Sequence, residues 1–172
     1  MSKKQKKIVI ILSVLCAAFI LFDVVLYFSL NSRQLNNGSS ENNDGTGLSI
    51  VSYTENGEWM EVETSYGKFH YPFAFSDIIK IEAVNKGVSA QLRFSAKIED
   101  KIIDAYTIYF NEPKGVPCGI LKMSEEIPVT VEFENAPKKL DDDWLITFNA
   151  VQETFNDVLI SMSENNDFEI SD

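Results

Sequence analysis

The sequence predicts an α+β domain in which an antiparallel β-meander sheet is covered by a C-terminal helix, preceded by one N-terminal transmembrane helix. Three patterns carry this prediction. An apolar run fills residues 8–30, apolar residues alternate along 88–98 and along 127–133, and an apolar helical stripe runs from Trp144 to Met162. These patterns are typical of a membrane anchor, half-buried strands and an amphipathic helix, respectively.

The apolar run 8–30 is long enough to cross a membrane as a helix. Its 23 residues rise about 1.5 Å each, which covers a hydrocarbon core of about 30 Å. Four lysines lie in the basic tail 1–7, whereas residues 31–172 carry 11 Lys/Arg and 25 Asp/Glu. Positive charge on the short tail favours a cytoplasmic N-terminus. We therefore expect a single-pass plasma-membrane protein that contacts lipid through its anchor and holds its C-terminal domain outside.

A cleaved secretory signal is the alternative interpretation of the same segment. Such signals have an apolar core of about 7–15 residues followed by an Ala-x-Ala-like site. The run here is longer, and no such triplet follows it. Cys16 follows Val14 and Leu15 in the middle of the run, which does not fit a lipoprotein signal. The uncleaved anchor is the favoured interpretation.

Asp23 is the one charged residue within the anchor. A charge near the centre of a membrane helix costs about 2.5–3.5 kcal/mol on insertion scales. One interpretation is an intramembrane polar contact with a partner helix. The other, which we favour, is that Asp23 is protonated or lies outward of the midpoint, where water or headgroups reach it.

Residues 31–47 are predicted to be a flexible tether, and residues 48–172 a single domain. The tether is rich in Asn, Ser and Gly, so it cannot bury enough apolar surface to offset the entropy of ordering. The remaining segment has the ordinary size of a domain with one core. Its cysteine, Cys118, cannot pair with Cys16 across a membrane, which excludes an intrachain disulfide scaffold.

Alternation and short turn sequences divide the first part of this domain into extended segments. They are expected at 59–64, 66–75, 78–84, 88–98, 102–110, 116–123 and 127–133. The clearest alternation places six apolar residues on one face: Val88, Ala90, Leu92, Phe94, Ala96 and Ile98. Hairpin-length connections between these segments predict an antiparallel meander with one buried face.

A change of period marks the predicted helix. From Trp144 to Met162 the apolar residues recur every three or four positions. The acidic run Asp141–Asp143 suits a helix N-terminus, although β-leaning residues leave open a start as late as Asn149. The acidic tail 164–172 is interpreted as solvated surface. The helix must bury its apolar stripe, and the open face of the meander is the available surface.

The aromatic segment 66–75 offers the candidate binding residues. Tyr66, His70 and Tyr71 are a candidate ligand platform, but we favour core packing for the segment, because its Phe and Tyr residues from 69 onward share one strand parity. His70 is the only histidine, so a histidine metal site or a Ser-His-Asp triad would have to use it. We expect an ordinary strand histidine instead.

Two short motifs lie at 66–73 (YGKFHYPF) and at 152–159 (QETFNDVL). They resemble motifs of a group of small, uncharacterised exported proteins of Gram-positive bacteria, although Val151 stands where that group usually has Met. The Tyr-Pro pair before a meander is also similar to PsbP/Mog1-like domains. The resemblance implies a membrane-anchored exported protein and brings no catalytic residue with it.

Composition and motifs argue against several classes of function. Nucleotide-loop, dinucleotide, serine-hydrolase and zinc-protease motifs are absent from the sequence, and we expect no cofactor and no metal. The excess of acidic residues argues against nucleic acid. The sequence therefore predicts a non-catalytic, membrane-anchored extracytoplasmic binding or interaction module. The alternatives are an exported envelope-polymer hydrolase that uses paired carboxylates, and a single-span subunit of a membrane complex with a protein partner.

Overall fold

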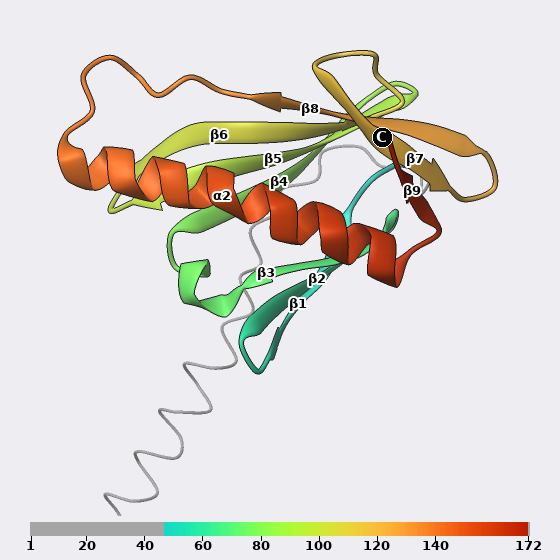
Figure 1. The fold of residues 1–172 in the computed structure, drawn as a ribbon, viewed down its shortest axis with the longest axis horizontal. Helices are drawn as coiled ribbons and strands as arrows, with labels where there is room; N and C mark the ends of the chain where they lie inside the picture. Colours follow the sequence, from blue (N-terminus) through green and yellow to red (C-terminus); the bar gives the residue numbers. More distant parts are fainter. Residues whose placement is uncertain (1–46, 172) are drawn as a thin grey trace, which may run out of the picture. The chain divides into compact units, whose positions relative to one another are not determined.

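The computed structural model describes residues 47–171, which form two antiparallel β-sheets and a long helix (Figure 1). The smaller sheet has the order β1-β2-β3, with β1 at Ile50–Asn56, β2 at Trp59–Thr64 and β3 at Gly67–Pro72. The larger sheet has the order β4-β5-β6-β8-β7-β9. Its strands are β4 Ile79–Lys86, β5 Ser89–Ile98, β6 Lys101–Phe110, β7 Val116–Lys122, β8 Glu126–Phe133 and β9 Phe168–Ile170. The short 3-10 helix η1 (Phe73–Phe75) connects the sheets, and the long helix is α2 (Asp142–Asn165).

The predicted basic tail, the anchor with Asp23 and tether residues 31–46 lie outside the described residues. Within residues 47–171, no helix combines the length and the hydrophobicity that crossing a membrane requires.

The α+β class with antiparallel sheets and a C-terminal helix is confirmed, but the strands do not form a single meander. The first three strands make a sheet of their own, and β1 was not predicted. In the larger sheet β8 lies between β6 and β7, because Tyr106–Phe110 of β6 pair with Val129–Phe133 of β8. The chain therefore leaves β6, passes over the next position in the sheet and returns through β7 and β8.

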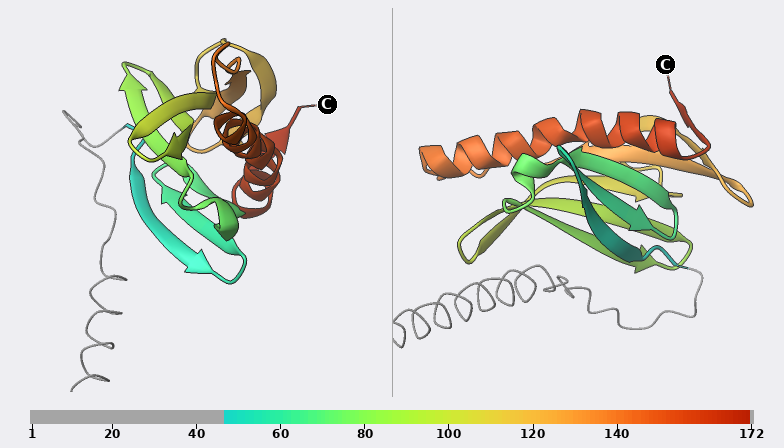
Figure 2. Two further views of the ribbon diagram at one scale, coloured as in Figure 1. Left: turned by 90° about the vertical axis from the view of Figure 1, so that its left-hand side faces the viewer. Right: turned by 90° about the horizontal axis from the view of Figure 1, so that it is seen from below.

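Helix α2 packs against both sheets. It contacts β5 and β6 of the larger sheet, and its later turns contact β3 of the smaller sheet (Figures 1 and 2). Phe148, Val151 and Val158 on the packed side are at most 1% exposed. Full burial of such a side chain stabilises the fold by about 1.5–3 kcal/mol. The predicted apolar stripe is thus the docking face of the helix.

The core is rich in aromatic rings on the helix side of the larger sheet. Phe94 of β5 stacks on Tyr106 of β6 with centroids 4.4 Å apart, and Phe69 of β3 lies 5.8 Å from Phe94. The Tyr106 hydroxyl, 3.2 Å from Thr154 Oγ1, gives this buried phenol a hydrogen-bond partner on α2. The two sheets and the helix therefore share one core.

The helix begins where the acidic run predicts. Asp141 is the N-cap, and its Oδ1 accepts a hydrogen bond of 2.9 Å from the Trp144 backbone N–H. The helix does not start as late as Asn149, and the β-leaning residues Leu145 and Ile146 are helical and exposed. Packing of Trp144 and Phe148 in the core outweighs the β-leaning propensity of the residues between them.

Two further positions differ from the sequence prediction. Val88 is 84% exposed, because it belongs to the turn before β5, where Gly87 has a φ of +64°. The tail was expected to be solvated throughout, but Phe168 is only 6% exposed and pairs with Leu121 as part of β9. Phe168, an apolar residue within the acidic tail, thus adds β9 to the sheet beside β7.

Side chains of α2 and of its C-cap residue, Asn166, cover the outer edge of β3. Asn166 Oδ1 accepts from the Lys68 backbone N–H at 2.8 Å, and Asn166 Nδ2 donates to the Lys68 carbonyl at 2.7 Å. Ser161 Oγ accepts from the His70 backbone N–H at 2.9 Å. These bonds replace a neighbouring strand and protect the edge from pairing with another chain.

Candidate functional site

The structure separates the three residues of the predicted platform. Tyr71 is 3% exposed on the core side of the small sheet, where burial raises its phenol pKa well above the usual value. His70 faces the other side, with its ring 4.4 Å from the Trp59 ring. Tyr66 is half-buried, edge-on to Phe110 at 5.4 Å. No single surface carries all three side chains, and Asp23 lies outside the described residues.

A better-formed site lies beside the connection between β6 and β7. We call it the loop cleft. It has a volume of about 400 Å³, which lies within the usual range of small-ligand sites. Three prolines and Ile120 supply its apolar lining, and polar side chains lie beside them. The lining residues are Asn111, Glu112, Pro113, Gly115, Pro117, Gly119, Ile120, Pro128, Val129, Thr130 and Ser171.

The loop over this cleft is fixed by hydrogen bonds at both ends. The Asn111 backbone N–H donates to the Pro128 carbonyl at 2.9 Å, although Asn111 has a φ of +58°, a conformation that Asn tolerates better than most residues. Thr130 Oγ1 lies 3.1 Å from the Glu112 carbonyl and also bonds the Lys114 carbonyl. These bonds hold the loop against β8.

Gly115 lets the loop approach β8 closely. Its φ is +84°, and a Cβ atom there would lie 2.1 Å from the Val131 carbonyl oxygen. Only glycine fits both the dihedral angle and the space.

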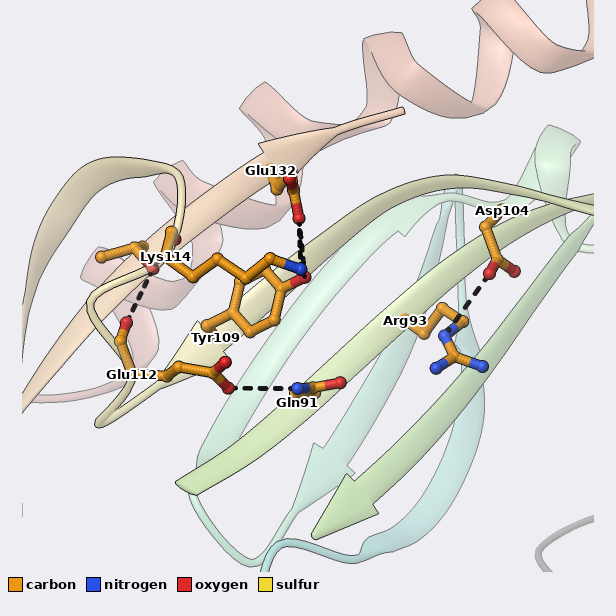
Figure 3. A network of polar contacts seen from close by, with 8 residues as sticks. Gln91, Arg93, Asp104, Tyr109, Glu112, Lys114 and Glu132 are labelled. Atoms are coloured by element: carbon orange, nitrogen blue, oxygen red, sulfur yellow. Dashed lines mark hydrogen bonds and ion pairs between the residues drawn. The ribbon is translucent and has the colours of Figure 1, made fainter. Parts of the chain in front are cut away.

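A polar trio, formed by Tyr109, Lys114 and Glu132, lies beside the loop on the same side of the sheet (Figure 3). Lys114 Nζ lies 2.8 Å from both the Tyr109 hydroxyl and Glu132 Oε2, and the Tyr109 hydroxyl donates to Glu132 Oε2 at 2.9 Å. Glu132 and then Tyr109 raise the pKa of the Lys114 ammonium above its usual value. Lys114 in turn lowers the pKa of Glu132, with help from Tyr109. The trio therefore keeps one positive and one negative charge at neutral pH.

The polar face continues from the trio across β5. Gln91 Nε2 donates to Glu112 Oε2 at 3.1 Å, which connects the loop to β5. Farther along, Arg93 Nε lies 3.6 Å from Asp104 Oδ2 (Figure 3). Ser95 Oγ donates to Asp104 Oδ1 at 2.8 Å. The loop cleft thus lies on the side of the sheet where polar side chains of β5 and β6 pair with one another and with the loop.

A second, shallower depression lies on the helix side, where β8 ends. We call it the aromatic–amide depression. Its volume is about 370 Å³, and its lining combines two phenyl rings with amide and carboxylate side chains. The lining residues are Phe133, Asn149, Gln152, Glu153, Phe155 and Asn156.

Cys118 lies on β7 between Pro117 and Gly119, two residues that line the loop cleft. Burial raises the pKa of the Cys118 thiol to about 11, so the thiol stays protonated. The loop cleft is lined by one carboxylate, Glu112, and the aromatic–amide depression by one, Glu153. Neither lining contains the pair of carboxylates that the hydrolase alternative requires. Residues 47–171 also contain no cluster of three or more His, Cys, Asp or Glu side chains suited to a metal ion.

The chain matches no known family, no curated protein and no solved structure. Its function must therefore be argued from the site geometry, and the resemblances described above remain predictions.

In the sequence, residues 111–115 are only the connection between two predicted strands, 102–110 and 116–123. The sequence signal that could have pointed to this loop is the row of polar residues at alternate positions of β5 and β6. Gln91, Ser95 and Thr107 occupy the side opposite the apolar face and are at most 5% exposed. A polar second face is visible in the sequence, but its burial depends on strand neighbours that only the structure reveals.

Proposed function

We propose that the chain is a membrane-anchored extracytoplasmic binding module, and that the loop cleft holds its ligand. The observation that carries the binding role is a preformed cleft whose covering loop is fixed by side-chain hydrogen bonds from Thr130 and Gln91. A preorganised site loses less conformational entropy when its ligand binds, so more of the interaction energy appears as affinity.

The lining suggests the kind of ligand. Pro113, Pro117, Pro128 and Ile120 offer an apolar floor, while Asn111 and Thr130 bring polar groups to it. Such a cleft suits a compact ligand with an apolar body and a few hydrogen-bonding groups. The module is non-catalytic in this proposal, because the lining of the cleft holds one carboxylate, Glu112, and no His, Cys or Lys side chain.

Methyl NMR with a fragment library tests the cleft. In the full chain, labelled in Ile methyls and held in a lipid nanodisc, ligands of the cleft should shift Ile120. Ile160, which is 52% exposed on α2, is the control and should not move. Fragment hits that leave Ile120 unchanged would contradict the assignment of the cleft.

Labelling of intact cells tests the anchor and its orientation. We would place a cysteine at Ile146, which is 67% exposed, in a Cys16→Ser background. Cys118 is 6% exposed and serves as an unlabelled internal control. A membrane-impermeant maleimide should label the protein in intact cells, and the labelled protein should sediment with membranes. Labelling only after lysis would reject the extracytoplasmic orientation.

A further inference from the structure

The aromatic–amide depression has a lining that the loop cleft does not share. Four of its residues, Asn149, Gln152, Glu153 and Asn156, are spaced i, i+3, i+4 and i+7 along α2. That spacing puts them on one side of the helix. Phe133 from the end of β8 and Phe155 complete the lining. Residues from two elements thus form one surface.

The aromatic part of the lining is held in place. The Phe133 ring is perpendicular to Phe155, with centroids 5.1 Å apart, and lies 5.9 Å from the Tyr106 ring. Phe133 nevertheless remains 44% exposed. A fixed phenyl ring with this much exposed surface can pack against the C–H face of a ligand at a small entropic cost.

The amide and carboxylate side chains of the lining have two different roles. Gln152 Nε2 donates to the Ala105 carbonyl at 2.9 Å and to the Glu134 carbonyl at 2.8 Å, which fixes the chain after β8. Within residues 47–171, by contrast, no hydrogen bond engages the side chains of Asn149, Glu153 or Asn156. These side chains present both amide donors and carbonyl or carboxylate acceptors.

The charge of the lining restricts the ligand. It contains no Lys or Arg, so an anion would find no counter-charge there, and it has a single carboxylate. Hydroxyl groups both donate and accept hydrogen bonds, which fits a mixture of amides and one carboxylate. A pyranose ring adds an apolar C–H face that fits an exposed phenyl ring.

We propose that the aromatic–amide depression binds a neutral saccharide unit. Phe133 packs against the sugar ring, and Asn149, Glu153 and Asn156 bind its hydroxyl or acetamido groups. The site lies on the helix side of the larger sheet, so it does not depend on the loop cleft.

Titration with defined oligosaccharides tests the proposal. The full chain in lipid nanodiscs, free of sugar-based detergent, is titrated with tetra-N-acetylchitotetraose and with cellotetraose while side-chain amide NMR signals are followed. We expect saturable binding of at least one tetramer with a Kd of about 0.1–5 mM. The shifts should include the Asn149 and Asn156 side chains.

Matched variants separate this site from nonspecific binding. Phe133→Ala and Asn156→Ala should each weaken binding at least about fivefold, which corresponds to about 1 kcal/mol. Ile160→Ala, on the same helix but outside the depression, should leave the affinity unchanged. Asn156→Ala changes an exposed side chain, so it keeps the test valid if Phe133→Ala disturbs the fold.

Three results would overturn the proposal. One is the absence of saturable binding of both tetramers up to about 10 mM. The second is binding that Phe133→Ala and Asn156→Ala leave unchanged. The third is saturable binding of choline that Glu153→Gln abolishes while neither tetramer binds, which would assign the depression to a cation instead.

Discussion

The two faces of the larger sheet are both buried along β5 and β6, but by different means. On the helix side, Leu92, Phe94 and Ile108 are at most 1% exposed beneath apolar neighbours. On the other side, Gln91 and Ser95 are at most 3% exposed, yet their partners are polar side chains of neighbouring strands and the loop. Within residues 47–171, every buried side-chain nitrogen or oxygen has a hydrogen-bond partner.

The two faces contribute differently to the stability and to the geometry of the domain. Apolar packing is strong in sum but has little directional preference, so the helix side supplies most of the folding free energy. Hydrogen bonds contribute less net energy but fix distances and angles. The polar side therefore holds the loop and the cleft in one arrangement.

The largest effect is expected on the helix side. Phe148 is 1% exposed in the core, so Phe148→Ala should lower the free energy of unfolding by about 3–5 kcal/mol through lost burial and a residual cavity. Urea denaturation measures the change. Ile146→Ala, which removes a 67% exposed side chain two positions earlier, is the control and should change stability by less than about 0.5 kcal/mol. Equal losses would mean that α2 is not docked as described.

An intermediate effect is expected at the loop. Gly115→Ala forces a Cβ atom against the Val131 carbonyl at a φ of +84°. Gly57 also has a positive φ, of +64°, but nothing lies within 4 Å of its Cβ position. Gly57→Ala should therefore cost only about 1 kcal/mol of backbone strain, and Gly115→Ala clearly more. Thermal unfolding of both variants makes the comparison, and equal losses would contradict the tight packing of the loop on β8.

The sequence predicted the helix side of this comparison better than the polar side. Alternation through Leu92 and Phe94 and the stripe through Phe148 are local patterns, and both proved to be core. The insertion of β8 beside β6 depends on long-range register, which no local pattern encodes. The loop cleft depends on that insertion, because Thr130 must lie next to the loop to bind it. The site could therefore not be predicted from residues 111–115 alone.

The smallest effect on stability is expected at the exposed ion pair of Lys114 and Glu132. The pKa of Glu132 is lowered in the fold, so its ion pair stabilises the protein above the usual carboxyl pKa of about 4.3 and is lost as the pH falls through the lowered value. The pKa of Lys114 is raised, so its contribution is present below about pH 10.4 and is lost as the pH rises through the raised value.

Glu132→Gln makes this pH dependence measurable. The stability difference between the native protein and the variant should stay constant from about pH 5 to 10 and should shrink as the pH falls through the lowered pKa of Glu132. Urea midpoints across this range give the difference. A difference that is independent of pH would show that the trio contributes through hydrogen bonding alone.

The central claim is that polar bonds, and not apolar packing, hold the loop over the cleft. Hydrogen exchange of the Asn111 amide, which donates to the Pro128 carbonyl, tests this claim directly in the native protein and in Thr130→Val. Valine keeps the shape of threonine but removes the bonds to the Glu112 and Lys114 carbonyls. We predict protection of Asn111 comparable to that of β8 in the native protein, and its selective loss in Thr130→Val while β5 stays protected. An Asn111 amide that exchanges as fast as an exposed turn in the native protein, or one that Thr130→Val leaves protected, would contradict the account.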